Sequence, residues 1–134
     1  MSKRLKIGVV GAGRMGSLHA RMLGKHPGFE LVGVADTNAW RAQIAAWRAG
    51  TAPFRDYEDL LGKVDAVIVA VPTEFHFKVG MAALDAGKHV LIEKPIAATV
   101  AEAKGLLDMA EQRKVQLQVG HIERFNPAFL ELQS

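Results

Sequence analysis

A glycine-rich turn near the N-terminus is the feature that most constrains how this chain can fold. The apolar segment LKIGVV is typical of a strand, and the residues after it place Gly11, Gly13 and Gly16 in the spacing G-x-G-x-x-G. The spacing alone is a weak signal, but between a strand and a helix it is typical of dinucleotide-binding folds. There the first glycine permits the tight turn, the second lets a diphosphate approach the backbone, and the third lets the helix pack on the sheet. The N–H groups near Arg14 and Met15 would then bind the diphosphate.

An aspartate follows at the distance that this motif requires. Asp36 lies 20 residues after Gly16, at the end of a second apolar segment. A carboxylate there accepts hydrogen bonds from the ribose hydroxyls of NAD and repels the 2′-phosphate of NADP. We therefore expect the cofactor to be NAD rather than NADP, with Thr37 as a neighbouring contact. Arg41, one helical turn further on, could reach back and bring a positive charge to the same place. A role of Asp36 as the cap of the helix that begins near residue 39 is compatible with the ribose contact. The alternative for the glycines is a turn that serves only the packing of strand against helix.

Strand and helix patterns alternate along the chain. Short segments rich in Val, Ile and Leu predict strands, and the segments between them have helical spacing. The predicted strands are residues 5–10, 30–35, 52–54, 65–71, 89–93 and 115–120. The predicted helices are residues 14–25, 39–48, 57–61, 75–86 and 100–113, with caps at Asp56 and Thr99 and a terminating Gly87. The alternation indicates an α/β fold, a doubly wound parallel sheet of the Rossmann type with strand order 3-2-1-4-5-6.

Composition narrows the classes of protein. The chain has 134 residues, 49% of them hydrophobic, which fits one domain over residues 1–134. The absence of cysteine excludes disulfides, thiolate zinc sites and cysteine nucleophiles. The net charge of +3 comes from scattered residues, so we expect no nucleic-acid partner. With no apolar run near 20 residues and no signal peptide pattern, we expect a cytoplasmic protein without a membrane partner. His76, His89 and His121 lack ligand spacing, so no metal site is expected.

The remaining polar residues follow the last three long predicted strands. The segments VPTEFH, EKP and GHIERFNP stand where those strands end, and ligands of doubly wound folds bind at that edge of the sheet. We therefore expect Lys94 to meet the nicotinamide half of the cofactor. An ammonium there can neutralise a developing alkoxide, while Glu93 can orient a ribose hydroxyl or balance the charge. The alternative for Lys94 is a solvated charge at a strand end.

Four segments, in this order and spacing, resemble the N-terminal half of the Gfo/Idh/MocA oxidoreductases: GVVGAGRMGSLHARML, VAVPTEFH, AGKHVLIEKPIAATVAEA and VGHIERFNPA. The resemblance covers essentially the whole chain, and E-K-P is its most specific mark. It implies reversible hydride transfer between a sugar hydroxyl carbon and NAD(P), with Lys94 beside the nicotinamide as the catalytic residue, and with Thr73 and His76 lining the nicotinamide ribose pocket. The candidate cofactor contacts are thus Gly11, Gly13, Arg14, Met15, Gly16, Asp36, Thr37, Val71, Pro72, Thr73, His76, Glu93 and Lys94.

The segment GHIERFNPA is similar to family members that oxidise C3 of UDP-N-acetylated hexosamines or hexuronates. The resemblance therefore implies a sugar or nucleotide-sugar substrate, with His121 and Arg124 as candidate contacts besides Lys94. Arg124 could instead form an ion pair at a domain interface. His19, inside the first predicted helix, we expect to be a packed or capped histidine rather than a ligand.

The chain departs from the resembled family in length. Family members have a second domain that carries further acid–base residues, most substrate contacts and the usual oligomer interface, and residues 121–134 would begin the connection to it. We therefore expect this chain to bind NAD with little turnover, and the full-length protein to be a homo-oligomer. Apolar surface around Phe125, Phe129 and Leu130 would favour self-association of the isolated domain.

Two other functions fit parts of the pattern. A regulatory module that senses a dinucleotide would need the glycine loop and Asp36 but not Lys94, since the fold alone hosts many functions. A Rossmann domain for another nucleotide, such as a nucleotide sugar or coenzyme A, would not need Asp36.

Overall fold

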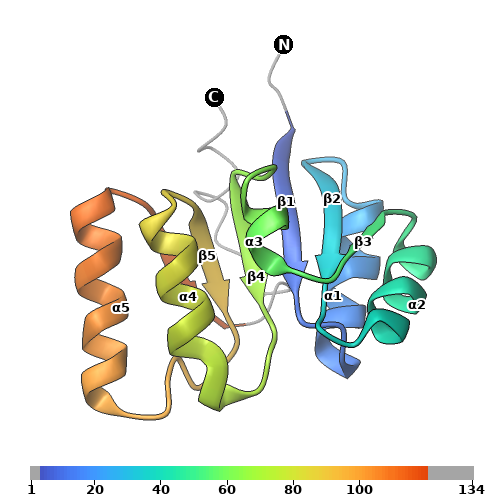
Figure 1. Ribbon diagram of the computed structural model, residues 1–134. Helices are drawn as coiled ribbons and strands as arrows, with labels where there is room; N and C mark the ends of the chain where they lie inside the picture. Colours follow the sequence, from blue (N-terminus) through green and yellow to red (C-terminus); the bar gives the residue numbers. More distant parts are fainter. Residues whose placement is uncertain (1–3, 121–134) are drawn as a thin grey trace.

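Six parallel strands form one sheet in the computed structural model, which describes residues 4–120 (Figure 1). Their order is β3-β2-β1-β4-β5-β6, all neighbours pairing in parallel, which confirms the predicted doubly wound topology. The strands are β1 Leu5–Val10, β2 Phe29–Ala35, β3 Ala52–Phe54, β4 Ala66–Val69, β5 His89–Ile92 and β6 Leu117–Val119. The chain leaves β1 toward β2 on one side and later returns to β4 on the other, so the topological switch point lies between β1 and β4.

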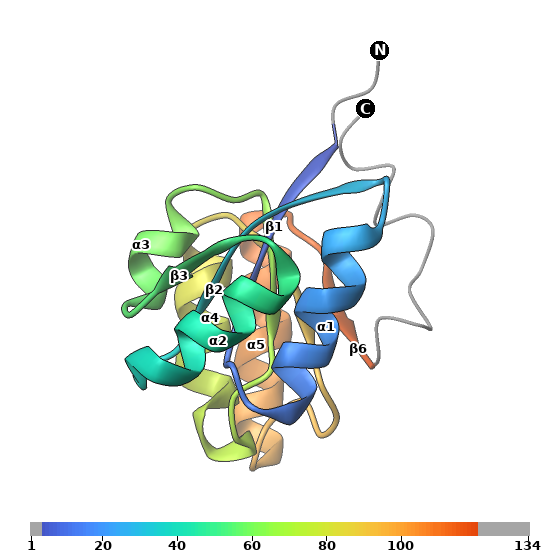
Figure 2. The same ribbon diagram turned by 90° about the vertical axis from the view of Figure 1, so that its right-hand side faces the viewer.

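Helices cover both faces of this sheet (Figure 2). They are α1 Arg14–Lys25, α2 Ala39–Ala49, α3 Tyr57–Leu61, the 3₁₀ turn η1 Thr73–Phe75, α4 His76–Asp85 and α5 Val100–Arg113. On one face, α1 and α2 bury small and branched side chains such as Ala20, Leu23 and Ala45 against β1 and β2. On the other, α3, α4 and α5 bury Leu60, Leu84 and their neighbours. Because both faces are covered, β4 is buried at every position, as its unbroken apolar sequence predicts.

The helix ends follow the predicted signals. The side chains of Asp56 and Thr99 accept hydrogen bonds from the first turns of α3 and α5, and Gly87 has the positive φ of 80° expected after a helix. The cap of α2 is Asn38, whose side chain accepts from the Arg41 N–H. The interpretation of Asp36 as the cap of this helix was therefore wrong.

Five of the predicted elements have the same bounds in the structure, and the boundaries of the others differ by one or two residues. The predicted helix over residues 75–86 is a 3₁₀ turn followed by α4, and β4 is shorter than the predicted 65–71. Asp65 N and Ala70 N still donate to carbonyl oxygens of β1, so the pairing extends past the assigned strand. None of the described helices has the length and apolar character needed to cross a bilayer.

Candidate functional site

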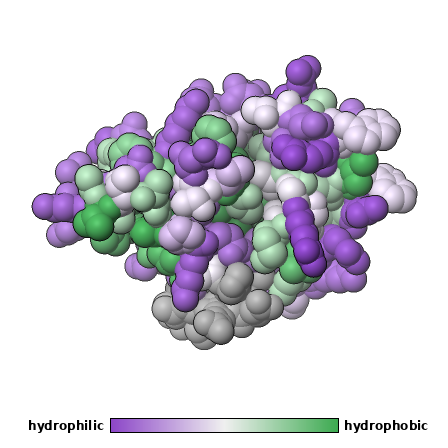
Figure 3. Space-filling view, turned by 90° about the horizontal axis from the view of Figure 1, so that it is seen from below, coloured by the Kyte–Doolittle hydropathy of each residue, from purple (hydrophilic) through white to green (hydrophobic). Residues whose placement is uncertain are grey.

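A cavity of about 580 Å³ lies at the carboxyl edge of β1, β2 and β4, beside the switch point. Figure 3 views the molecule from this edge and shows polar side chains standing around apolar ones. The lining comes from the ends of three strands, the glycine loop and the first turns of the following helices. Its members are Val10, Gly11, Gly13, Arg14, Met15, Ala35, Asp36, Thr37, Arg41, Arg55, Tyr57, Ala70, Val71, Pro72, Phe75, Lys78 and Val79.

The glycine loop forms the floor of this cavity. Gly11 has a φ of 109°, a conformation that side chains rarely adopt, and its backbone passes close to Ala70. A Cβ on Gly16 would lie 1.8 Å from the Gly11 carbonyl oxygen, so α1 can approach the loop only because this residue is glycine. These two positions therefore have the turn and packing roles that the sequence predicted.

Gly13 differs from Gly11 and Gly16 because it faces open space. A Cβ built there meets nothing within 4 Å, although Gly13 lines the cavity and is the N-cap of α1. No side chain among residues 4–120 caps this helix, and its first turn contains no acidic residue. The first N–H groups of α1 thus point toward the cavity without an intrahelical partner, next to the positive end of the helix dipole. The chemistry of this corner suits an anion such as a diphosphate.

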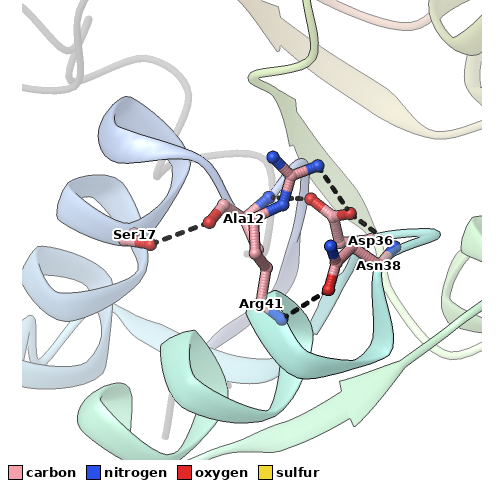
Figure 4. Close-up of polar contacts among 5 residues, drawn as sticks. All are labelled: Ala12, Ser17, Asp36, Asn38 and Arg41. Atoms are coloured by element: carbon pink, nitrogen blue, oxygen red, sulfur yellow. Dashed lines mark hydrogen bonds and ion pairs between the residues drawn. The ribbon is translucent and has the colours of Figure 1, made fainter.

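Asp36 connects the glycine loop to the end of β2 (Figure 4). Its Oδ2 accepts from Ala12 N at 2.8 Å, and its Oδ1 accepts from Asn38 N at 2.8 Å and from the Arg41 guanidinium at 3.2 Å. The Asp36 side chain is only 8% exposed, whereas that of Arg41 is 57% exposed. The two short backbone bonds fix the carboxylate at the cavity wall, and the longer bond to Arg41 lies on the solvent side.

The charge of the cavity is mostly positive. Of its described lining residues, Arg14, Arg41, Arg55 and Lys78 are cations and Asp36 is the one carboxylate. Burial raises the pKa of the Tyr57 hydroxyl, and the neighbouring carboxylates raise it further. Tyr57 is therefore a neutral hydrogen-bonding group at physiological pH.

Eight of the predicted contacts line the cavity: Gly11, Gly13, Arg14, Met15, Asp36, Thr37, Val71 and Pro72. Four further lining residues were not predicted as cofactor contacts: Arg55, Tyr57, Phe75 and Lys78. Arg55 directly follows β3, so the rule that sites lie after strand ends could have found it. Phe75 and Lys78 share one face of η1 and α4, and only the turn after Pro72 directs that face toward the cavity.

A second group of predicted residues lies apart from the cavity, around the end of β5. Lys94 is exposed, directly after Glu93, and the peptide bond from Lys94 to Pro95 is cis. His76 is buried, and its ring nitrogens lie 2.9 Å from the carbonyl oxygens of Val71 and Pro95. Thr73 begins η1 between the two groups.

His19 is buried in α1, in agreement with the prediction of a packed histidine. Its Nε2, however, forms a hydrogen bond with Glu93 Oε1 across 74 residues of sequence. This contact was not predicted. Helix spacing places His19 on the buried side of α1 but does not show which residue lies opposite.

Several predicted residues lie outside the described part of the chain: His121, Arg124, Phe125, Phe129 and Leu130. Within residues 4–120, no three or more His, Asp or Glu side chains are placed to share a metal ion.

Comparison with known proteins places this geometry in a family. Residues 5–121 match the family model GFO_IDH_MocA, described as an oxidoreductase family with an NAD-binding Rossmann fold. UDP-N-acetylglucosamine 3-dehydrogenase from Acidithiobacillus ferrooxidans is 40% identical over 124 residues, 92% of this chain. A crystal form of that enzyme superposes on 97% of this chain with a TM-score of 0.85.

Two further solved structures hold ligands. Scyllo-inositol dehydrogenase from Lactobacillus casei, with bound NAD(H) and scyllo-inositol, is 30% identical, with a TM-score of 0.82 over 97% of this chain and 40% of its own. A 3-ketoreductase from Actinomadura kijaniata, in complex with TDP-benzene and NADP, is 30% identical, with a TM-score of 0.82 over 97% of this chain and 42% of its own. The chain spans 39% of the length of the matched Acidithiobacillus dehydrogenase.

Proposed function

The chain belongs to the Gfo/Idh/MocA oxidoreductases, and from this we propose that it binds NAD for hydride transfer to and from a hydroxyl carbon of a sugar or nucleotide sugar. The observation that carries the proposal is the cavity in which an open glycine position, a helix N-terminus and a fixed carboxylate meet. The open glycine position leaves room for the diphosphate, and the helix N-terminus matches its negative charge. The carboxylate matches the ribose diol.

The residues present fit this cofactor. The first N–H groups of α1 and the Arg14 side chain would hold the diphosphate, since Gly13 leaves its approach open. Asp36 would accept the ribose hydroxyls. A carboxylate has about four acceptor positions, and three are already used. Of the three donors, the exposed Arg41 is the one that can move aside.

Lys94 is the residue that we propose for contact with the reacting atoms. Bound NAD would supply the hydride acceptor for oxidation of the alcohol. Lys94 follows β5 at the same edge of the sheet, one strand beyond the β4 end that contributes Val71 to the cavity. Its ammonium can neutralise the alkoxide that forms as the hydroxyl proton leaves. The resemblance of the E-K-P segment to the family supports this role.

We propose NAD rather than NADP as the preferred cofactor. With Asp36 as the ribose contact, a 2′-phosphate would meet the like charge of its carboxylate, which two backbone hydrogen bonds hold in place. Arg41 and Arg55 beside it reduce the repulsion, and the related 3-ketoreductase is in complex with NADP. Selectivity should therefore be moderate, and the ratio of the two affinities is the quantity to measure.

The test is calorimetric titration of the chain and its Asp36→Ser variant with NADH and NADPH. Loss of two hydrogen bonds to the ribose should raise the Kd for NADH roughly tenfold, while the Kd for NADPH should fall or stay unchanged. Asp59→Ser, which removes an exposed carboxylate of α3 away from the cavity, is the matched control. A wild-type chain that binds neither cofactor, or an Asp36→Ser variant with an unchanged ratio of affinities, would contradict the proposal.

A further inference from the structure

Two histidines are the buried polar side chains of the described part of the chain, His19 at 1% and His76 at 2% exposure. They come from different helices on opposite faces of the sheet, α1 and α4. Their hydrogen bonds nevertheless meet in one short segment after β5. His19 contacts Glu93 and His76 contacts Pro95, so the two residues that flank Lys94 are each held by a buried histidine.

His76 holds two loops together. Nε2 lies 2.9 Å from the Val71 carbonyl oxygen, in the wall of the cavity, and Nδ1 lies 2.9 Å from the Pro95 carbonyl oxygen. Carbonyl oxygens only accept hydrogen bonds, so a neutral ring can donate to one of the two, and both bonds form together only when both ring nitrogens carry a proton. The ring therefore lies between two segments: the one after β4, which lines the cavity, and the one after β5, which contains Lys94.

His19 acts on the other side of Lys94. Its Nε2 bonds to the Glu93 carboxylate, and its Nδ1 is buried without a hydrogen-bond partner among the described residues. Among residues 4–120, the hydrogen bond of this side chain is thus directed at Glu93. The Glu93 carboxylate turns toward α1 and is mostly buried, while Lys94, the next residue, is exposed.

A role in packing alone does not account for this pair. Burying an imidazole costs free energy that an apolar side chain of similar volume would not cost, unless its hydrogen bonds are made. His19 is among the buried residues of α1 with Ala20 and Leu23, and His76 is among those of α4, and both direct a ring nitrogen at the segment around Lys94.

We propose that His19 and His76 are positioning residues that hold Glu93 and Pro95, on the two sides of Lys94, and so direct its ammonium to the nicotinamide end of the cofactor. This inference rests on the proposed function of Lys94. It predicts that loss of either contact with the 93–95 segment affects the nicotinamide half of the site while the adenosine half is spared.

The two contacts use different ring nitrogens, which allows a sharp test. An asparagine amide lies near the place of Nδ1 and a glutamine amide near that of Nε2. At position 76, His76→Asn can keep the bond to Pro95, and His76→Gln loses it. At position 19 the order is reversed, because His19→Gln can keep the bond to Glu93 and His19→Asn loses it. A role in filling volume would instead make glutamine the milder replacement at both positions.

The experiment measures the Kd of each variant for NADH and for ADP-ribose, which lacks the nicotinamide ring. We expect His76→Gln and His19→Asn to weaken NADH binding roughly three- to tenfold, the other two variants to stay within about twofold, and all four to bind ADP-ribose like the wild type. His26→Gln, an exposed histidine beyond the end of α1, is the control. Equal effects on both ligands, unchanged NADH binding in all four variants, or glutamine as the milder residue at both positions would overturn the inference.

Amide hydrogen exchange of residues 92–97 in the same variants needs no ligand. Exchange should be faster in His76→Gln than in His76→Asn, and faster in His19→Asn than in His19→Gln. Equal rates would overturn the inference. If the wild type bound neither NADH nor ADP-ribose, the proposed function would fail, and the exchange rates would still decide whether the two histidines hold the segment. If circular dichroism shows that a variant at one position does not fold, the two variants at the other position decide the question.

Discussion

At the scale of single residues, two glycines of the same loop limit the chain for different reasons. A methyl group on Gly16 would collide with the Gly11 carbonyl oxygen, whereas one on Gly13 meets no protein atom within 4 Å. The first restriction belongs to the fold. At Gly13 the described residues leave room for a side chain, so the absence of one there is explained by the diphosphate that we propose to bind beside it.

The pair Gly13→Ala and Gly16→Ala should therefore separate binding from stability. Gly16→Ala should lower the free energy of unfolding by about 1–3 kcal/mol, because the added methyl group forces α1 away from the loop. Gly13→Ala should leave the melting temperature within a few degrees of the wild type and weaken NADH binding at least tenfold, since its methyl group occupies the approach of the diphosphate. Thermal melts and NADH titrations of both variants check this, and a Gly13→Ala variant that binds NADH normally would show that no ligand group approaches there.

At the scale of elements, β6 is attached to the sheet through β5, the strand that delivers Lys94. Three residue pairs join the two strands, and the Gln116 N–H donates to His89 Nδ1 at 3.0 Å at the start of this pairing. Nδ1 can accept this bond only while it carries no proton. Burial lowers the pKa of His89 from its ordinary value of 6.5, and the nearby Asp65 carboxylate opposes this shift.

The stability of this edge should depend on pH. Because the folded-state pKa lies below the unfolded value, unfolded His89 binds a proton first as the pH falls, so its contribution is complete above pH 6.5 and is lost as the pH drops through the folded pKa. The variant His89→Asn keeps an acceptor near Nδ1 and does not titrate. Urea unfolding between pH 7.5 and 5 should show a smaller loss of stability in the variant, and parallel curves for the two proteins would count against a titrating role for His89.

The elements also show what sequence patterns can and cannot predict. Helix caps, strand order and the glycine loop depend on residues close in sequence or on rules of topology, and the structure confirms them. The contacts of His19 with Glu93 and of His76 with Pro95 join residues 74 and 19 positions apart. A periodic pattern shows that a histidine is buried but not which backbone it faces, so these contacts required coordinates.

At the scale of the whole molecule, the sheet divides the site into two halves. The strands β1, β2 and β4 surround the cavity proposed for the adenosine half, and β5 carries the segment with Lys94. The titratable neighbours of Lys94 in the described chain have other partners, since the ring nitrogens of His76 face two carbonyl oxygens and Glu93 bonds to His19. A general base must lie within hydrogen-bond reach of the proton that it removes.

We therefore expect the 134-residue chain to bind NADH but to oxidise sugars or nucleotide sugars at least a thousandfold more slowly than the longer Acidithiobacillus dehydrogenase, a loss within the 10²–10⁴ range usual for acid–base catalysis. Steady-state assays with UDP-N-acetylglucosamine and scyllo-inositol, monitored as NADH formation, measure this difference. A rate comparable to that of the Acidithiobacillus dehydrogenase would mean that Lys94 and its described neighbours are sufficient for catalysis.

The helix α1 begins at the glycine loop and contains His19, so a single element reaches both halves. The six residues from Gly13 to His19 correspond to about 9 Å of helical rise. A hydrogen-bonded helix changes little in length over such a span. The distance between the proposed diphosphate position and the His19 imidazole is therefore set by one rigid helix and not by the summed tolerances of loops and strands. An insertion in any surface loop of this protein can leave that spacing intact, whereas one residue added within α1 between Gly13 and His19 would turn the imidazole by about 100° away from Glu93.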